Sequence, residues 1–234
     1  MTQIEKQVSY LRKRITELVS LCQKDSSPTV SDDVLNTAQD IISRLRRLLD
    51  NIMSEYYINR IKPHLSVQDA KASKPTFPIC DKVEDIKGQL GKFNAADLET
   101  ISPEVYKIIE KAQPYHTSNK WIKYLRDYYN LGHWRLVAQE KKRDISLVLG
   151  DVIRISDRAS VTMNNCLVNG VPVDYLRVDK GAISGRLDAR LNPRVEIKVL
   201  YLLEGENVDV LWLCQKSLTE IELILKSFAE KARL

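Results

Sequence analysis

The chain has 234 residues, of which 44% are hydrophobic and 29% charged, which suits one large globular domain or two small ones. With 8 glycines and 8 prolines it carries no compositional sign of disorder, and no apolar run approaches the roughly 18 residues that would predict a membrane span. The four cysteines are scattered, so their spacing predicts neither a zinc site nor a disulfide framework and favours a reduced, cytoplasmic protein.

The net charge of +5 is unevenly distributed along the chain. Residues 1–143 hold 24 basic and 18 acidic residues, whereas residues 144–234 hold 12 and 13. Most of the excess lies in residues 120–143, which contain seven basic and two acidic residues. A concentrated basic segment favours an anionic partner.

Apolar residues recur every three or four positions through much of the first 143 residues, which is the spacing of amphipathic helices. Ser31, Ser102 and Ser118 stand where they would cap three of these helices, and Pro63 ends one of them. The predicted helices cover residues 2–24, 31–62, 81–93, 103–112 and 118–129.

From residue 144 the pattern changes to short runs of β-branched residues. Residues 161–168 and 171–178 flank Asn169 and Gly170, a pair that predicts a hairpin because a type I′ turn needs positive φ at both central positions. Residues 194–203 alternate between apolar and polar side chains, which predicts a half-buried strand. The sequence from Ser217 to Glu220 matches a capping box and predicts that a last helix begins there.

Residues 113–135 contain two of the three histidines, His116 and His133, and six of the sixteen aromatic residues. Basic residues interleaved with aromatic rings suit single-stranded nucleic acid, which offers phosphates and base faces. The plainer interpretation is that aromatic residues at helical spacing form core. The candidate nucleic-acid-binding residues are Lys120, Lys123, Asp127, Asn130, Arg135, Lys141, Lys142 and Arg143.

Arg126 and His133 are the candidate catalytic residues. Seven positions on a continuous helix are nearly two turns, so both side chains would share one face about 10 Å apart. A histidine can move protons during cleavage of RNA, and an arginine can stabilise charge on the phosphoryl oxygens, without a metal. The alternative is that His133 lies at a helix end or in the core and that Arg126 is an ordinary surface charge.

The sequence from Arg126 to His133 resembles the motif of the HEPN superfamily (higher eukaryotes and prokaryotes nucleotide-binding), in which four to six residues separate an arginine from a histidine. Asp127 fits the polar residue that commonly follows that arginine. Residues 45–50 (Leu-Arg-Arg-Leu-Leu-Asp), 77–79 (Phe-Pro-Ile) and 113–116 (Gln-Pro-Tyr-His) resemble motifs of uncharacterised bacterial HEPN-like proteins that carry a β-rich tail. Residues 130–135 keep the Asn and Arg of the last motif of those proteins and shift its histidine, which favours loss of catalysis.

The helical spacing up to residue 143 and the strand pattern after it predict an α+β fold, and the resemblance implies that residues 1–143 form a HEPN-like helical bundle. The small antiparallel β-sheet and C-terminal helix over residues 144–234 are expected to pack on that bundle. The resemblance also implies a homodimer without cofactor or metal. The expected function is a non-catalytic interaction module that binds a partner protein or a nucleotide in a bacterial defence or regulatory assembly. The alternative is a metal-independent ribonuclease, a toxin or anti-phage effector, that uses Arg126 and His133 on RNA. A DNA-binding regulator that uses the basic segment is a third interpretation.

Overall fold

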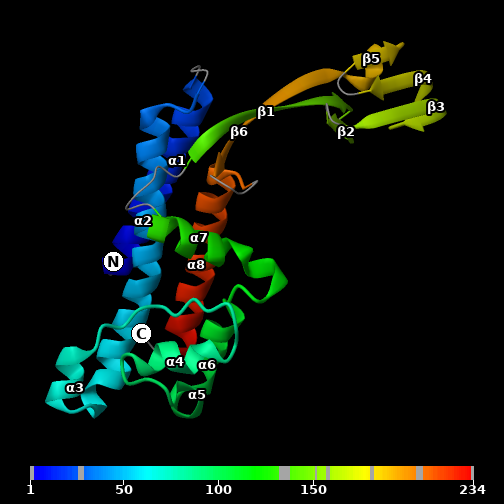
Figure 1. The fold of residues 1–234 in the computed structure, drawn as a ribbon. Helices are drawn as coiled ribbons and strands as arrows, with labels where there is room; N and C mark the ends of the chain where they lie inside the picture. The colour runs from blue at the N-terminus through cyan, green and yellow to red at the C-terminus, as the bar shows by residue number, and fades with distance from the viewer. Residues whose placement is uncertain are drawn as a thin grey trace. The chain divides into compact units, whose positions relative to one another are not determined.

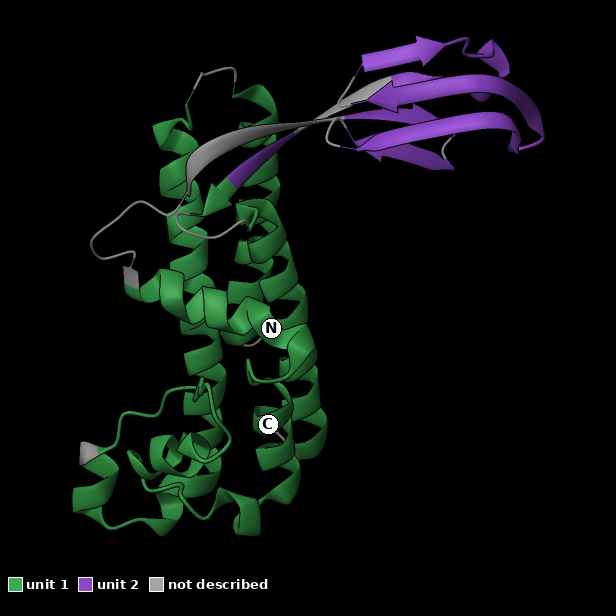
Figure 2. Ribbon diagram, turned by 45° about the vertical axis from the view of Figure 1, so that its right-hand side comes forward, with its two compact units in different colours: residues 1–139, 202–234 green, residues 140–201 purple. Residues whose placement is uncertain are grey.

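The computed structural model of the chain describes residues 3–25, 29–131, 138–150, 152–156, 159–179, 182–203 and 208–232. These residues form helices and two small antiparallel sheets, which confirms the predicted α+β class (Figure 1). The chain divides into two compact units (Figure 2). We call residues 1–139 and 202–234 the helical unit, and residues 140–201 the strand unit.

The last helix, α8 (Val210–Ala232), belongs to the helical unit, which corrects the expectation that it groups with the β-rich region. It contacts α1, α2, α6 and α7. Leu213, Ile221 and Phe228 are fully buried, and the Phe228 ring meets Tyr56 edge to face with centroids 5.8 Å apart. Burial of this apolar face, rather than position in the sequence, decides which unit the helix joins.

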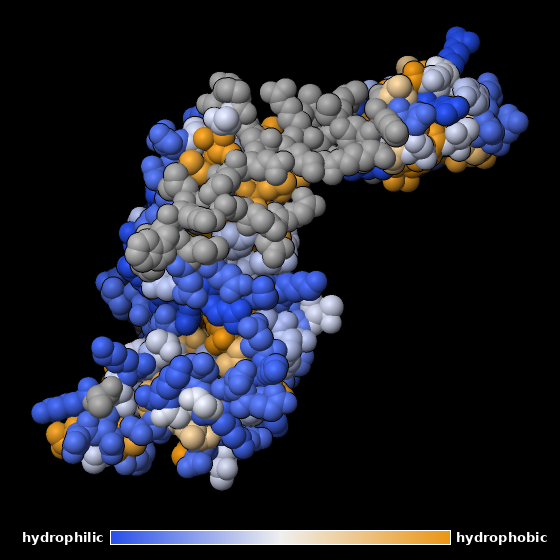
Figure 3. Space-filling model, viewed as in Figure 1, coloured by the Kyte–Doolittle hydropathy of each residue, from blue (hydrophilic) through white to orange (hydrophobic). Residues whose placement is uncertain are grey.

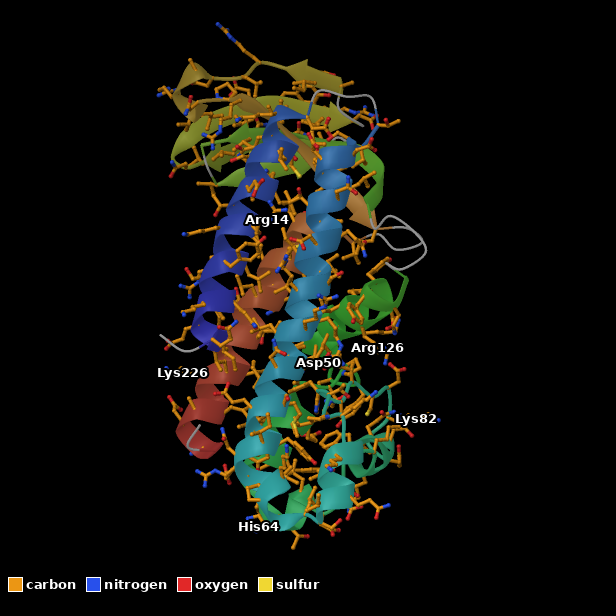
Figure 4. All side chains as sticks on the ribbon, turned by 90° about the vertical axis from the view of Figure 1, so that its left-hand side faces the viewer. Arg14, Asp50, His64, Lys82, Arg126 and Lys226 are labelled. Atoms are coloured by element: carbon orange, nitrogen blue, oxygen red, sulfur yellow. The ribbon has the colours of Figure 1, made fainter. Side chains whose placement is uncertain are left out.

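Two long helices form the frame of the helical unit. α1 (Gln3–Lys24) and α2 (Asp32–Tyr56) lie side by side (Figure 4), because each buries apolar residues at intervals of three and four. The sequence predicts that the second helix runs up to Pro63. In the structure α2 ends at Tyr56, and the chain continues as a π-helical turn (Tyr57–Ile61) and a 3₁₀ turn (Lys62–His64). Proline lacks the N–H that a continued α-helix would use, so the hydrogen-bond pattern changes before it.

Shorter helices complete the unit: α3 (Val67–Ala72), α4 (Asp85–Gly91), α5 (Leu98–Ile101), α6 (Pro103–Lys111) and α7 (Lys120–Leu131). Ser31 and Ser102 occupy the predicted cap positions of α2 and α6, but neither side chain makes a capping hydrogen bond. Ser118 is not a cap, because a 3₁₀ turn (Thr117–Asn119) precedes α7. Among the described helices none is long and apolar enough to cross a membrane.

The strand unit consists of two three-stranded sheets, with orders β2-β1-β6 and β3-β4-β5. The predicted hairpin is confirmed: Val168 pairs with Val171, and Asn169 and Gly170 have φ of 51° and 76°. The predicted strand at residues 194–203 is β6. The strands are β1 (Ala138–Leu149), β2 (Ile153–Ser156), β3 (Ser160–Val168), β4 (Val171–Asp179), β5 (Ala182–Gly185) and β6 (Arg194–Leu203).

Both sheets contribute to a single hydrophobic core in the strand unit. Leu149 and Ile155 come from the first sheet, and Val173 and Leu176 come from the second. The opposite face of the β3-β4-β5 sheet is exposed and includes apolar side chains; we call this the outer face and define it by Leu167, Pro172 and Tyr175.

The capping-box prediction at Ser217 is wrong. α8 begins at Val210, two turns earlier, and Ser217 is fully buried within it. The carboxylate of Asp209 accepts a hydrogen bond from the Trp212 backbone N–H at 3.3 Å and starts the helix instead. Burial of the apolar residues before Ser217 stabilises helix there, so the local signal did not decide the start.

Candidate nucleic-acid interface

α7 carries five of the predicted site residues on its polar side. Its apolar side packs in the helical unit and contacts α2 and α8. The surface over α7 in Figure 3 is largely hydrophilic. The five residues are Lys120 and Asn130, which are exposed, and Lys123, Arg126 and Asp127, which are half-buried.

Asp127 pairs with Lys123, a candidate nucleic-acid-binding residue, and with Arg126, a candidate catalytic residue. Its Oδ2 lies 2.9 Å from Nζ of Lys123, and its Oδ1 accepts a hydrogen bond from Nε of Arg126 at 2.8 Å. The three side chains together carry one net positive charge. This part of α7 is therefore a less attractive surface for phosphate than its basic residues alone suggest.

Arg126 also reaches across to the loop between α3 and α4. Its Nη1 donates to the backbone carbonyl of Ile79 at 3.4 Å, and its Nη2 donates to Oδ1 of Asp81 at 3.2 Å. The side chain is 22% exposed. Burial lowers the pKa of the guanidinium, but the hydrogen bonds to Asp127 and Asp81 raise it by a larger amount, so the pKa lies above its ordinary value. All three guanidinium nitrogens have partners within the chain.

The aromatic residues of this segment belong partly to the core. Trp121 and Tyr128 are 1% and 4% exposed, so neither ring can stack on a base. Tyr124 and Tyr129 are half-buried. The plainer interpretation therefore holds for the two most buried rings.

Several predicted site residues lie outside what the structure describes. His133 and Arg135 fall between the described residues 131 and 138, so the geometry of an Arg126/His133 pair stays a prediction. The backbone of Lys141, Lys142 and Arg143 belongs to β1, and their side chains are outside the described set.

The structure does bring together several side chains that form hydrogen bonds with the backbone of residues 77–80. We call residues 77–80 the clamped segment. Asp50 Oδ1 accepts from the Phe77 N–H at 2.9 Å, and Arg46 Nη2 donates to the Phe77 carbonyl at 3.1 Å. These two α2 residues also form an ion pair at 2.7 Å (Asp50 and Arg126 are labelled in Figure 4). Burial raises the pKa of the Asp50 carboxyl and lowers that of the Arg46 guanidinium, and their mutual attraction opposes both shifts.

Gln113 supplies the largest number of contacts to the clamped segment. Its side chain is fully buried. Its Oε1 accepts from the Cys80 N–H at 2.8 Å, and its Nε2 donates to the carbonyls of Pro78 at 3.0 Å and Ile109 at 2.8 Å. With Arg46, Asp50 and Arg126, it satisfies five backbone groups of the clamped segment. The motifs at residues 45–50, 77–79 and 113–116 thus meet at a single structural junction.

The rest of the turn after Gln113 folds back on α6. Glu110 Oε1 accepts from the Tyr115 hydroxyl at 3.1 Å and lies 2.9 Å from Nε2 of His116. Burial and the hydrogen bond to Glu110 raise the pKa of Tyr115. Sequence reasoning missed both Glu110 and Asp81 as partners, because neither has a distinctive spacing to the residue that it contacts.

Cys80 offers a direct measure of how firmly the segment is held. It is 3% exposed, and burial raises the pKa of its thiol to about 11, so alkylation of the folded protein should be slow. Replacement Arg126→Ala removes a charged donor from the Ile79 carbonyl, and we expect roughly tenfold faster Cys80 alkylation through local opening. Peptide mass spectrometry after timed alkylation at pH 8 would measure it.

Lys123→Ala is the matched control, because it removes the other Asp127 partner without touching the clamped segment. Cys214, fully buried on α8, reports global unfolding in the same samples. An equal rise at Cys80 in both variants, or no rise in either, would contradict a positioning role for Arg126.

Within the described ranges, no group of three His, Cys, Asp or Glu side chains could hold a metal ion. Comparisons with protein-family models, with curated proteins and with solved structures give no match for this chain. The functional argument therefore rests on the chain's own residues.

Proposed function

We propose that the chain is a non-catalytic interaction module of the HEPN-like type, which binds a partner protein in a bacterial defence or regulatory assembly. The resemblance of its motifs to that superfamily extends the proposal to a homodimer. The observation that carries the non-catalytic assignment is the engagement of Arg126 by Asp127, Asp81 and the Ile79 carbonyl.

A metal-independent ribonuclease needs its arginine at the phosphoryl oxygens of the substrate, where charge develops during cleavage. Release of Arg126 for that purpose would break hydrogen bonds from all three of its guanidinium nitrogens. It would also free one carbonyl of the clamped segment. An arginine with this set of partners supports a positioning role rather than a catalytic one.

The outer face of the strand unit supports a protein partner. Leu167 is 71% exposed and Tyr175 is 45% exposed, although both belong to well-formed strands whose other face is in the core. Figure 3 shows hydrophobic residues among the surface atoms of this unit. Aromatic residues are enriched at protein interfaces, and exposed apolar groups on a rigid sheet suit such contacts.

Two measurements on the full chain test the proposal. The tagged protein, purified from the cells that produce it, should retain one protein in a fixed ratio, and RNA incubated with it in EDTA should stay intact. The double variant Leu167→Ser/Tyr175→Ser should lose the retained protein. Val67→Ser is the matched control, because Val67 is 73% exposed but lies on α3 of the helical unit.

Retention of the partner by the double variant would contradict the role of the outer face. RNA cleavage in EDTA that is lost in His133→Ala would replace the proposal with the ribonuclease alternative. A protein that retains no partner and leaves RNA intact would contradict the interaction module.

A further inference from the structure

We infer that a cavity between α6 and the C-terminal half of α8 binds a small apolar carboxylate, which joins one carboxylate group to a short apolar chain or ring. The cavity has a volume of about 300 Å³, and residues of α6, α8 and the start of α7 line it. Its lining residues belong to the helical unit and include none of the candidate nucleic-acid-binding residues, the clamped segment or the outer face. The cavity is therefore separate from the surfaces described above.

The spacing along two helices brings the lining side chains together. Ile108 and Lys111 lie three positions apart on α6. Ile224, Ser227 and Lys231 lie three and four positions apart on α8. Such intervals place side chains on one face of a helix. Because α6 contacts α8, as Figure 1 shows, the two faces border the same cavity.

The wall of the cavity contains a hydrogen-bond donor that has no partner. Trp121, in the first turn of α7, lines the cavity and is only 1% exposed. Its indole Nε1 is buried and finds no acceptor among the described residues. A buried donor without a partner is costly, and most such groups in folded proteins are satisfied. A carboxylate oxygen bound in the cavity would supply the acceptor that this N–H lacks.

The charges around the cavity leave two cations for an anionic ligand. Lys111 and Lys231 line it, are exposed, and have no ion-pair partner among the residues that the structure describes. Their ammonium groups can therefore bind a carboxylate. The carboxylates among the lining residues each have a lysine partner already: Glu104 with Lys107 at 3.5 Å, Glu220 with Lys216 at 2.5 Å and Glu230 with Lys226 at 4.0 Å.

The apolar part of the lining suits a short hydrocarbon group. Ile224 is 7% exposed, Ile108 is half-buried and Leu223 is 54% exposed, so a ligand in contact with them would remove apolar surface from water. The side-chain amide of Asn119 donates to the Lys111 carbonyl and ties the turn before α7 to the end of α6. A volume of about 300 Å³ is the lower end of the range for small-molecule sites, which favours a small ligand.

Isothermal titration calorimetry on the full chain tests the inference with octanoate, octanamide, octylamine and acetate. Octanoate should bind saturably. Octanamide lacks the charge and should bind roughly tenfold more weakly, because neutral hydrogen bonds replace charge-assisted ones. Octylamine carries the opposite charge and acetate lacks the apolar chain, so neither should bind saturably. No saturable binding of octanoate, or equal binding of octanoate and octylamine, would overturn the inference.

A short peptide distinguishes two sources of the carboxylate. The peptide acetyl-Gly-Gly-Leu, with a free carboxyl terminus, offers the same chemistry at the end of a polypeptide. Tighter binding of this peptide than of octanoate would support the carboxyl terminus of another chain as the ligand, and the reverse order would support a free small acid.

Two double variants separate the cavity lysines from the net charge of the chain. Lys111→Gln/Lys231→Gln should weaken octanoate binding roughly tenfold or more, because it removes both unpaired cations of the lining. Lys13→Gln/Lys71→Gln makes the same change of net charge at exposed positions outside the lining and should have no effect. Equal losses in the two variants, or no loss in either, would overturn the inference.

The Trp121 indole reports contact with the ligand directly. In nuclear magnetic resonance spectra of the chain with isotope-labelled tryptophan, the Trp121 Nε1–H signal should move downfield as octanoate saturates the cavity, because the N–H gains an acceptor. Trp121→Phe identifies this signal by its absence and should bind octanoate roughly tenfold more weakly. Trp212 is the internal control, because it is 44% exposed near the start of α8 and does not line the cavity. An unmoved Trp121 signal at saturation, or unchanged binding by Trp121→Phe, would contradict the inferred site.

Discussion

Replacement of Gln113 by alanine is expected to lower the free energy of unfolding of the helical unit by about 3 kcal/mol or more. The side chain is fully buried, and its loss leaves the Cys80 N–H and the Pro78 carbonyl without their hydrogen bonds. Each buried, unsatisfied polar group costs about 1–3 kcal/mol. The Ile109 carbonyl keeps one hydrogen bond, because it also accepts from the Ala112 N–H. Urea unfolding monitored by circular dichroism measures the change.

Gln68→Ala is the control, because Gln68 is exposed on α3 and should change stability by no more than about 0.5 kcal/mol. A loss in Gln113→Ala no larger than this would show that the clamped segment does not stabilise the fold.

Gln113→Glu adds a pH dependence with a definite sign. The new carboxyl group would face two carbonyl oxygens, so its pKa in the folded state should rise above its unfolded value of about 4.3. Only the protonated group can donate to those carbonyls. The stability of the variant relative to the unmodified chain should be greatest below about pH 4.3 and should fall as the pH rises through the folded-state pKa of the new carboxyl group. A variant whose stability relative to the unmodified chain does not change with pH would contradict the donor role of Gln113.

Replacement of Gly185 by alanine is expected to destabilise the strand unit by about 3 kcal/mol, combining backbone strain with a steric clash. Gly185 has φ of +113°, a conformation that L residues rarely adopt. A Cβ atom added there would lie 2.3 Å from the Tyr175 carbonyl oxygen on the neighbouring strand. Because Gly185 pairs with Leu176, relief of the clash would separate β5 from β4. Hydrogen exchange of the paired β4 and β5 amides measures this.

Gly170→Ala measures the destabilisation that backbone strain causes without a steric clash. Gly170 also has positive φ, at +76°, but nothing lies within 4 Å of an added Cβ. The Gly170→Ala substitution should therefore destabilise the strand unit by only about 1–2 kcal/mol. Equal exchange rates in the two variants would mean that the contact with the Tyr175 carbonyl does not limit the position.

Elements with strong local patterns could be predicted from the sequence. The apolar spacing located α1 and α2, and Asn169 and Gly170 located the β3–β4 turn, since these signals lie within a few residues. The start of α8 could not be predicted in this way. Ser217 and Glu220 fit a cap, yet burial of the residues before them extends the helix to Val210. That burial depends on α1, α2, α6 and α7, which are distant in sequence.

The candidate site could likewise be predicted from the sequence only where its contacts are local. The sequence singled out Arg126 and its neighbour Asp127, and these two side chains do contact each other. Its other partners, Ile79 and Asp81, are 47 and 45 residues away, and no spacing rule connects them. The resemblance pointed to residues 45–50, 77–79 and 113–116 separately. The three-dimensional arrangement connects them, because Arg46, Asp50 and Gln113 form hydrogen bonds with the backbone of residues 77–79.

The return of α8 to the helical unit has a consequence for the order in which the chain can fold during synthesis. The strand unit is contiguous, from residue 140 to residue 201, so it can fold as soon as it leaves the ribosome. The helical unit cannot be completed then, because α8 follows the strand unit in the sequence and contacts α1, α2, α6 and α7. Until α8 docks, the apolar surface that it covers stays open to solvent and to chaperones. The N-terminal half of this protein therefore finishes folding only after its C-terminal helix has been translated.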